Sequence, residues 1–123
     1  MATHNDFGKE AEDFAAKFLV DKGYTLLARN FYYQKGELDI IALLNNVLVV
    51  VEVKARSSSS FIEPYEAVDK RKIKLIVKAT DAFIQMQNRN EEVRFDIISV
   101  QKNKNNQLDL THIENAFEAM DSN

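Results

Sequence analysis

The central feature of this sequence is a pair of apolar runs, residues 38–44 and 47–55, which Asn45 and Asn46 separate. Both runs are rich in Val, Ile and Leu, which favour β-strands, and an Asn pair tolerates the positive φ angles of a tight turn. The pattern therefore predicts a β-hairpin. Because apolar residues follow one another instead of alternating with polar ones, the hairpin belongs to a sheet that is covered on both faces.

The register of this hairpin decides where its charged residues lie. A two-residue or a four-residue turn centred on the Asn pair places Asp39 directly opposite Glu52. The same register places Glu37 opposite Lys54, with all four side chains on one face at the open end of the hairpin. A three-residue turn would shift the register by one residue and separate these groups.

The opposed acids Asp39 and Glu52 require an explanation, whereas Glu37 and Lys54 are explained by a cross-strand ion pair. Like charges that face each other across a ladder are destabilising. The acids are tolerable if one is protonated or if a cation lies between them. Carboxylate ligands suit Mg²⁺ or Mn²⁺, with water and substrate phosphate at the remaining positions. The alternative is a slipped register in which both acids face water at strand ends.

Length and composition limit the class of protein. With 123 residues and 46% hydrophobic content, we expect one domain over residues 1–123, frayed at residues 1–5 and 121–123. The chain has no cysteine and only two histidines, which argues against thiolate or histidine-rich metal sites and against a histidine-based triad. No apolar run approaches the roughly 18 residues of a membrane span, and no signal peptide is visible. We therefore expect a cytoplasmic protein that does not contact membranes.

The net charge of −3 argues against tight non-specific binding to nucleic acid, but the charge is unevenly distributed. Residues 112–123 contain three acids and no Lys or Arg, whereas residues 64–80 contain five basic and two acidic side chains. A polyanion responds to such a local basic patch more than to the total charge.

The remaining periodicities predict the element order α-β-β-β-α-β-β-α. The expected elements are a helix over residues 6–22 that Gly23 ends, a strand over 24–34, the hairpin, a mobile serine-rich loop over 56–63, a helix from Pro64 to about residue 88, strands over 93–101 and 107–111, and a short terminal helix or ordered tail over 113–120. Helices before and after three strands can cover both faces of one mixed sheet, which makes this an α/β or α+β protein.

Five segments that follow one another along the chain resemble the YraN-like family of small bacterial proteins. They are "GKEAEDFAAKFLVDKGYTLLARNF", "KGELDIIA", "LVVVEVKAR", "PYEAVDKRK" and "RFDIISV". The family is related in fold to archaeal Holliday junction resolvases, and the acid, turn and E-x-K pattern resembles the PD-(D/E)-x-K nuclease superfamily. The resemblance implies an α/β, restriction-endonuclease-like fold with a mixed five-stranded sheet flanked by helices. The chain departs from the family pattern at Leu38, where a proline is usual, and at Ile62, where a glycine is more frequent.

The resemblance also implies roles for individual residues. Asp39 and Glu52 match the two metal-binding carboxylates, and Lys54 matches the catalytic lysine. Glu12 matches an acid that related resolvases place on the first helix beside the metal. Helical periodicity alone does not choose Glu12, because Glu10 flanks the opposite side of the same apolar stripe. Glu37, within the "GE-x-D" signature, is a further candidate acid.

Basic residues near the start of the second long helix are candidates for contact with nucleic acid. Cations are disfavoured at a helix N-terminus, so phosphate contacts explain the run better than helix stability does, although a solvated helix face is the alternative. These residues are Lys70, Arg71, Lys72 and Lys74. Arg56 follows Lys54 on the same strand face and would reach the same phosphate backbone. The aromatic residues 31–33 either pack in the core or stack on bases.

Three functions of different classes follow. The first is an endonuclease that uses Mg²⁺ or Mn²⁺ to hydrolyse phosphodiester bonds in branched or duplex DNA; a junction resolvase needs two active sites and hence a homodimer. Here Lys54 either orients the attacking water and stabilises phosphate charge or forms a structural ion pair. The second is a catalytically silent nucleic-acid-binding accessory protein of the same fold. The third is a protein-interaction module that uses the acidic C-terminal segment, unless that segment docks on its own domain.

Overall fold

The computed structural model describes residues 4–56 and 69–122, which form two long helices and a five-stranded sheet. The elements are α1 (His4–Asp21), β1 (Thr25–Tyr33), β2 (Gly36–Leu44), β3 (Val47–Arg56), α2 (Lys70–Gln87), β4 (Glu92–Lys102), β5 (Leu108–Phe117) and the 3₁₀ helix η2 (Ala119–Ser122). The strands lie in the order β1-β2-β3-β4-β5, and all neighbours are antiparallel except β3 and β4. This mixed α/β arrangement confirms the predicted fold class. The predicted serine-rich loop and the helix start at Pro64 lie outside the described residues.

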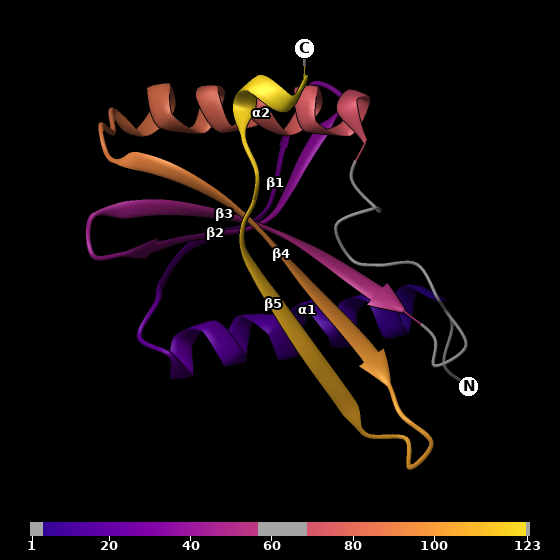
Figure 1. Cartoon of the computed structure of the whole chain (residues 1–123). Helices are drawn as coiled ribbons and strands as arrows, with labels where there is room; N and C mark the ends of the chain where they lie inside the picture. The colour runs from indigo at the N-terminus through magenta and orange to yellow at the C-terminus, as the bar shows by residue number, and fades with distance from the viewer. Residues whose placement is uncertain (1–3, 57–68, 123) are drawn as a thin grey trace.

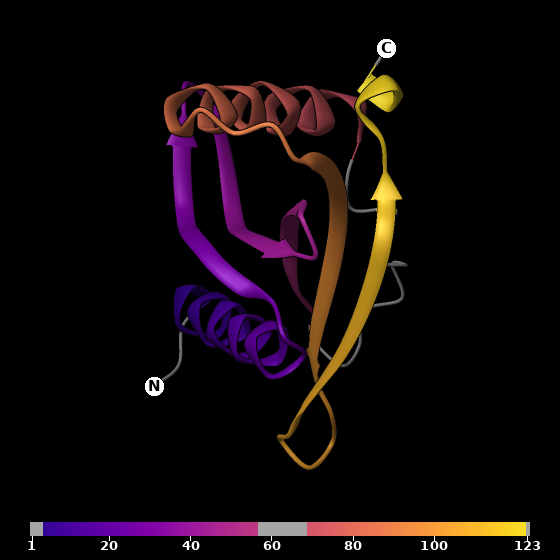
Figure 2. The same ribbon diagram turned by 90° about the vertical axis from the view of Figure 1, so that its left-hand side faces the viewer.

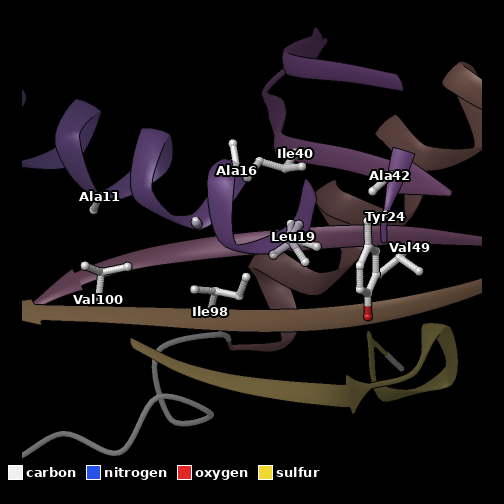
Figure 3. Packing of buried hydrophobic residues seen from close by; sticks show 11 residues of the cluster. Ala11, Ala16, Leu19, Tyr24, Ile40, Ala42, Val49, Ile98 and Val100 are labelled. Carbon is white, nitrogen blue, oxygen red and sulfur yellow. The ribbon is translucent and has the colours of Figure 1, made fainter. Parts of the chain in front are cut away.

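The two helices cover opposite faces of the sheet (Figures 1 and 2). Between α1 and the sheet lies a core that includes Leu19, Ile40, Val49 and Ile98 (Figure 3). A second core, between α2 and the sheet, is built from alternate residues of the same strands: Leu48, Val50, Ile73, Ile76, Phe83 and Ile97 are among its members. Burial on both faces explains why the hairpin strands are continuously apolar. Among the helices of the described residues, none is both long and apolar enough to cross a bilayer.

The end of α1 and the hairpin turn form as local sequence predicts, whereas the predicted helix from Pro64 does not include Asp69, which is extended and precedes α2. Gly23 adopts a φ of +96°, and the Tyr24 N–H bonds to the Leu19 carbonyl, which ends α1 in a glycine-based cap. Asn45 and Asn46 both have positive φ angles, as a two-residue hairpin turn requires. Before α2, the Asp69 side chain accepts a hydrogen bond from the Lys72 N–H at 2.9 Å and caps the helix.

The predicted hairpin register is correct for five residue pairs, from Leu44–Val47 to Ile40–Val51, and there the ladder ends. Beyond this point β2 stays paired with β1, whereas β3 stays paired with β4, so the two strands diverge (Figure 1). The prediction that Glu37 faces Lys54 is therefore wrong. Glu37 is paired with Tyr32 of β1, and Lys54 with Ser99 of β4, because each strand follows its outer neighbour.

The diverging end of β2 packs directly on α2. A Cβ atom at Gly36 would lie 2.6 Å from the carbonyl oxygen of Leu75 and 3.4 Å from the Cβ of Ala79. Only glycine allows the strand to approach the helix backbone this closely. The contact holds the first residues of β2 beside the N-terminal half of α2.

Of the two alternatives predicted for residues 113–120, a short terminal helix or an ordered tail, the helix is not formed. These residues instead prolong β5 to Phe117, and only Ala119–Ser122 are helical, in the short η2. The left-handed backbone of Asn115 accompanies an irregularity in the β4–β5 ladder, and Phe117 is buried in a stacked contact with Phe95, at 5.1 Å between ring centroids. Pairing with the edge of β4 outweighs the weak helical periodicity of so short a segment. The segment is thus docked on its own sheet.

We expect Phe117→Ala to lower the free energy of unfolding by about 3 kcal/mol, because it removes a buried aromatic side chain and leaves a cavity beside Phe95. Chemical denaturation measures this decrease. Met120→Ala is the matched control, since Met120 is 68% exposed and its truncation should change stability little. Equal stability of the two variants would show that the C-terminal segment does not contribute to the fold.

Candidate active site

Two acids lie where β2 and β3 diverge. Asp39 is 7% exposed and Glu52 is 6% exposed, so both carboxyl groups are withdrawn from water. The Val53 N–H donates to Asp39 Oδ2 at 2.8 Å, in the place where the next rung of the ladder would stand. The prediction that Asp39 and Glu52 are a directly opposed ladder pair is therefore wrong, because the ladder ends one residue earlier. A side-chain hydrogen bond to Val53 joins Asp39 to β3 across the fork between the strands, and the charge of Glu52 still acts on Asp39.

Two lysines approach one oxygen of Glu52. Lys72 Nζ lies 3.0 Å from Glu52 Oε1, and Lys54 Nζ lies 3.7 Å from the same atom. Lys54 comes from β3, as predicted, but Lys72 comes from the first turn of α2. Sequence reasoning assigned Lys72 to phosphate binding and missed its contact with Glu52, because no local pattern shows which face of the sheet meets this turn of the helix.

The site perturbs the acid–base properties of its residues. Burial and the neighbouring Glu52 carboxylate raise the pKa of Asp39 to about 8, against the opposing effect of the Val53 hydrogen bond. Burial lowers the pKa of Lys54 to about 8, and contact with Lys72 adds to this effect. For Lys72, burial acts to lower the pKa, but the Glu52 carboxylate and the contact with Lys54 leave it raised. Such opposed shifts are typical of functional sites.

A second group of acids adjoins the fork on the α1 side. When the Asn30 amide is assigned the orientation that satisfies its hydrogen bonds, its nitrogen donates to Glu12 Oε1 at 3.0 Å and to Glu37 Oε2 at 3.3 Å. Burial and the Glu37 charge raise the pKa of Glu12, and Arg29 opposes them. The charges of Glu12 and Glu37 also act on Asp39, so the other three predicted acids all lie within electrostatic range of Asp39.

Glu10 occupies a different environment, although helical periodicity made it as eligible as Glu12. Its carboxylate lies 3.5 Å from Lys102 Nζ at the other side of α1. Asn30, which joins Glu12 to Glu37, was not identified from the sequence. Its only unusual local property is a positive φ of 52° within a strand, and φ angles are not visible in a sequence.

Two hollows meet at Glu37. The first, of about 230 Å³, opens between β2 and α2 and is lined by Lys35, Gly36, Glu37, Glu52, Lys72, Leu75 and Ile76. The second, of about 370 Å³, lies between α1 and β1 and is lined by Gly8, Lys9, Glu12, Arg29, Asn30, Tyr32 and Glu37. Glu52 is therefore reached through the first hollow, Glu12 through the second and Glu37 through both, whereas Asp39 lines neither.

The acidic side chains are of the chemical type that binds a divalent metal ion, but their arrangement fits a metal site only in part. Carboxylate oxygens are suitable ligands for Mg²⁺ or Mn²⁺, and a carboxyl group that resists ionisation beside another acid lacks a compensating positive charge. Within residues 4–56 and 69–122, however, no three acidic or histidine side chains converge closely enough to hold a metal ion. The cations nearest to Glu52 are instead the ammonium groups of Lys54 and Lys72.

The other basic candidates lie beside this site. The side chains of Lys70, Arg71 and Lys74 are exposed on α2, whose first turn contains no acid. Arg56, at the end of β3, is partly buried. Positive charge thus continues from Lys72, at the fork, to exposed side chains on the first turns of α2.

The aromatic run of β1 is divided between core and surface. Phe31 packs edge-on against Phe83, at 5.3 Å between ring centroids, and belongs to the core. Tyr32 is 67% exposed at the rim of the site, and a hydrogen bond with Glu37 raises the pKa of its hydroxyl. Tyr33 is 39% exposed. Only the two tyrosines are therefore accessible for stacking.

A third buried acid, Asp96, was not a candidate and lies outside the fork. It accepts hydrogen bonds from Arg94 Nε and Nη2, both at 2.9 Å, and from the Asn115 N–H at 2.9 Å, and it bonds to His112 Nε2 at 2.8 Å. Burial acts to raise the pKa of Asp96, but its bonds with His112, Arg94 and Asn115 leave it lowered. Because this carboxylate is fully partnered, it serves to join β4 to β5.

Comparison with known proteins places the chain among bacterial sequences without an assigned activity. Residues 11–100 match the uncharacterised protein family UPF0102. UPF0102 protein FP2501 of Flavobacterium psychrophilum is 46% identical over 117 residues, which cover 95% of this chain and 98% of that protein. UPF0102 proteins of Phocaeicola vulgatus and Persephonella marina are 45% and 39% identical, covering 95% and 90% of this chain and 96% and 92% of their own lengths.

We expect Asp39→Asn to stabilise the protein in the absence of divalent cations, because the amide side chain does not ionise and its carbonyl oxygen still accepts the Val53 N–H. An acid with a raised pKa binds its proton more tightly in the folded state, so wild-type stability falls as pH rises from about 4 to about 8. The variant should be more stable at pH 8 by on the order of 2 kcal/mol and similar to wild type near pH 4.

Urea denaturation across this pH range measures both curves, and Asp109→Asn, at an exposed position on β5, is the control. Parallel curves for wild type and Asp39→Asn would contradict a raised pKa.

Proposed function

The chain belongs to the UPF0102 family, and from the site at its sheet fork we propose that it is a metal-dependent endonuclease that hydrolyses DNA phosphodiester bonds. The observation that carries the proposal is the pair of buried acids, Asp39 and Glu52, with Lys54 beside them. Burial of two neighbouring carboxyl groups costs stability, and an active site is the usual reason for such a cost.

The site residues divide into metal ligands and groups that act on the substrate. Asp39 and Glu52 would hold Mg²⁺ or Mn²⁺, with Glu12 as a third ligand or as a residue that orders a water molecule. When bound, the ion supplies Lewis acidity at a phosphate oxygen and lowers the pKa of a water ligand. Lys54 lies close enough to Glu52 to orient the attacking water or to stabilise charge that develops on the phosphate. Glu37, bonded to Asn30, would fix Glu12 in place.

The exposed basic side chains of Lys70, Arg71 and Lys74 would bind the DNA backbone. They are adjacent to the fork because α2 begins there, and phosphate contacts position a duplex without reading its sequence. Branched DNA, such as a recombination intermediate, is the substrate that we favour from the resemblance to junction resolvases. A resolvase would act as a homodimer, because it cuts two strands.

A catalytically silent nucleic-acid-binding protein of the same fold is the second candidate. The ion pairs of Glu52 with Lys54 and Lys72, and the lack of three converging acids within the described residues, favour it. Cleavage distinguishes the two candidates, because both of them bind DNA.

We expect the protein to cut labelled four-way junction or flap DNA in Mg²⁺ or Mn²⁺, and Asp39→Ala and Lys54→Ala each to lower the rate about 100-fold or more. Glu12→Ala should also lower the rate, whereas Glu10→Ala, on the same helix but paired with Lys102, should not. Duplex and single-stranded DNA serve as comparison substrates, and circular dichroism checks that each variant is folded. A wild-type protein that binds branched DNA without cutting it would establish the silent binding protein instead.

We expect replacement of Lys70, Arg71 and Lys74 together by Ala to weaken DNA binding at all sequences alike. The slope of log affinity against log salt should become shallower by about 0.9 for each phosphate group that the variant no longer binds. Fluorescence anisotropy over a salt series measures this slope.

A variant with Lys17, Lys22 and Lys104 replaced by Ala has the same net charge, with its substitutions at exposed positions away from α2, and is the matched control. Equal slopes for the two triple variants would contradict a binding role for the start of α2.

A further inference from the structure

Glu52 has more positive charge around it than one carboxylate needs. Lys54 and Lys72 both direct their ammonium groups at the same oxygen, Oε1, at 3.7 and 3.0 Å. Asp39, on the other side of the fork, has the Val53 N–H as its hydrogen-bond donor. Of the two ion pairs of Glu52, the shorter is formed by Lys72 of α2, and the longer by Lys54 of β3.

The two lysines differ in their freedom to move. The Lys54 side chain is 17% exposed and belongs to a strand that is paired along its whole length with β4. The Lys72 side chain is 39% exposed, starts from the first turn of α2 and lines the open hollow between β2 and α2. A flexible four-carbon side chain at the mouth of a hollow can turn outward without disturbing the sheet.

We propose that Lys72 is an exchangeable cation of the site: its ammonium group compensates Glu52 until a divalent cation binds there, and it then turns outward to contact a substrate phosphate. The inference rests on the metal site of the proposed function. Two ammonium groups and a divalent cation around one carboxylate oxygen would repel one another strongly, so metal entry favours displacement of one of the two ammonium groups. Lys72 is the one with an open path to solvent.

A displaced Lys72 side chain would lie near other basic side chains. Lys70, Arg71 and Lys74 are exposed on the same helix, so an outward Lys72 would add a further positive charge to this face. Metal binding would thereby be coupled to DNA binding, because Lys72 would leave Glu52 and become available for phosphate. A protein without metal would hold DNA more weakly.

The test is amine labelling of the full chain, with each lysine quantified by mass spectrometry. Lys72 should be poorly labelled without metal, labelled severalfold more in Mn²⁺, and protected again when Mn²⁺ is combined with phosphorothioate-substituted duplex DNA that resists cleavage. Lys17, exposed on α1, should label equally with and without Mn²⁺. Asp39→Asn should abolish the Mn²⁺-dependent change at Lys72.

A second measurement is Mn²⁺ affinity, by electron paramagnetic resonance of the free ion. Lys72→Met should bind Mn²⁺ at least about fivefold more tightly than wild type, because the competing cation is absent. Lys70→Met, two residues away on the exposed side, should bind as wild type does. The Lys72→Met variant also remains informative if it is less stable, since only its folded fraction is titrated.

The outcomes separate this inference from the proposed function. Mn²⁺ binding that depends on Asp39, with unchanged labelling of Lys72 and unchanged affinity in Lys72→Met, would overturn the exchange and leave the metal site intact. Absence of any Asp39-dependent Mn²⁺ binding would overturn both. Increased labelling in Mn²⁺ without protection by DNA would refute the phosphate contact.

Discussion

The Asp39 carboxylate accepts the Val53 N–H where the ladder between β2 and β3 ends. A backbone amide that loses its partner strand inside a covered sheet has to be satisfied, and here a side chain does so. The hydrogen bond therefore makes the divergence of the strands possible. From this point β2 follows β1 toward α2, β3 follows β4, and the space between them becomes the hollow that contains Glu52 and Lys72.

Buried charge is handled in two different ways on this sheet. Asp96 has donors on both oxygens from Arg94, His112 and Asn115, and its charge is fully compensated. At the fork, Glu52, Glu12 and Glu37 all act to raise the pKa of Asp39, and two lysines approach Glu52. The complete network joins strands, whereas the incomplete one at the fork is the basis of the proposed metal site.

The N-terminus of α2 contributes Lys72 to the fork, and the local sequence does not distinguish this lysine from its basic neighbours. The basic run there is unfavourable for the helix dipole, and Asp69 offsets part of this cost as the cap. The run led us to predict phosphate binding, which agrees with exposed Lys70, Arg71 and Lys74. It did not separate Lys72 from its neighbours, because the contact with Glu52 depends on how closely β2 approaches the helix at Gly36.

Sequence alone determined the features that follow from local chemistry: the two helices, the Asn45–Asn46 turn, the register of the first five hairpin pairs and the candidate acids Asp39 and Glu52. It left the C-terminal segment open between a helix and an ordered tail, because a weak helical pattern cannot show that the edge of β4 offers Phe117 a buried position beside Phe95. Only the tertiary structure decided where β2 leaves β3, which separates Glu37 from Lys54 and brings Asn30 and Lys72 to the acids. These contacts join residues far apart in the chain, and they depend on sheet divergence and helix packing, which no local periodicity encodes.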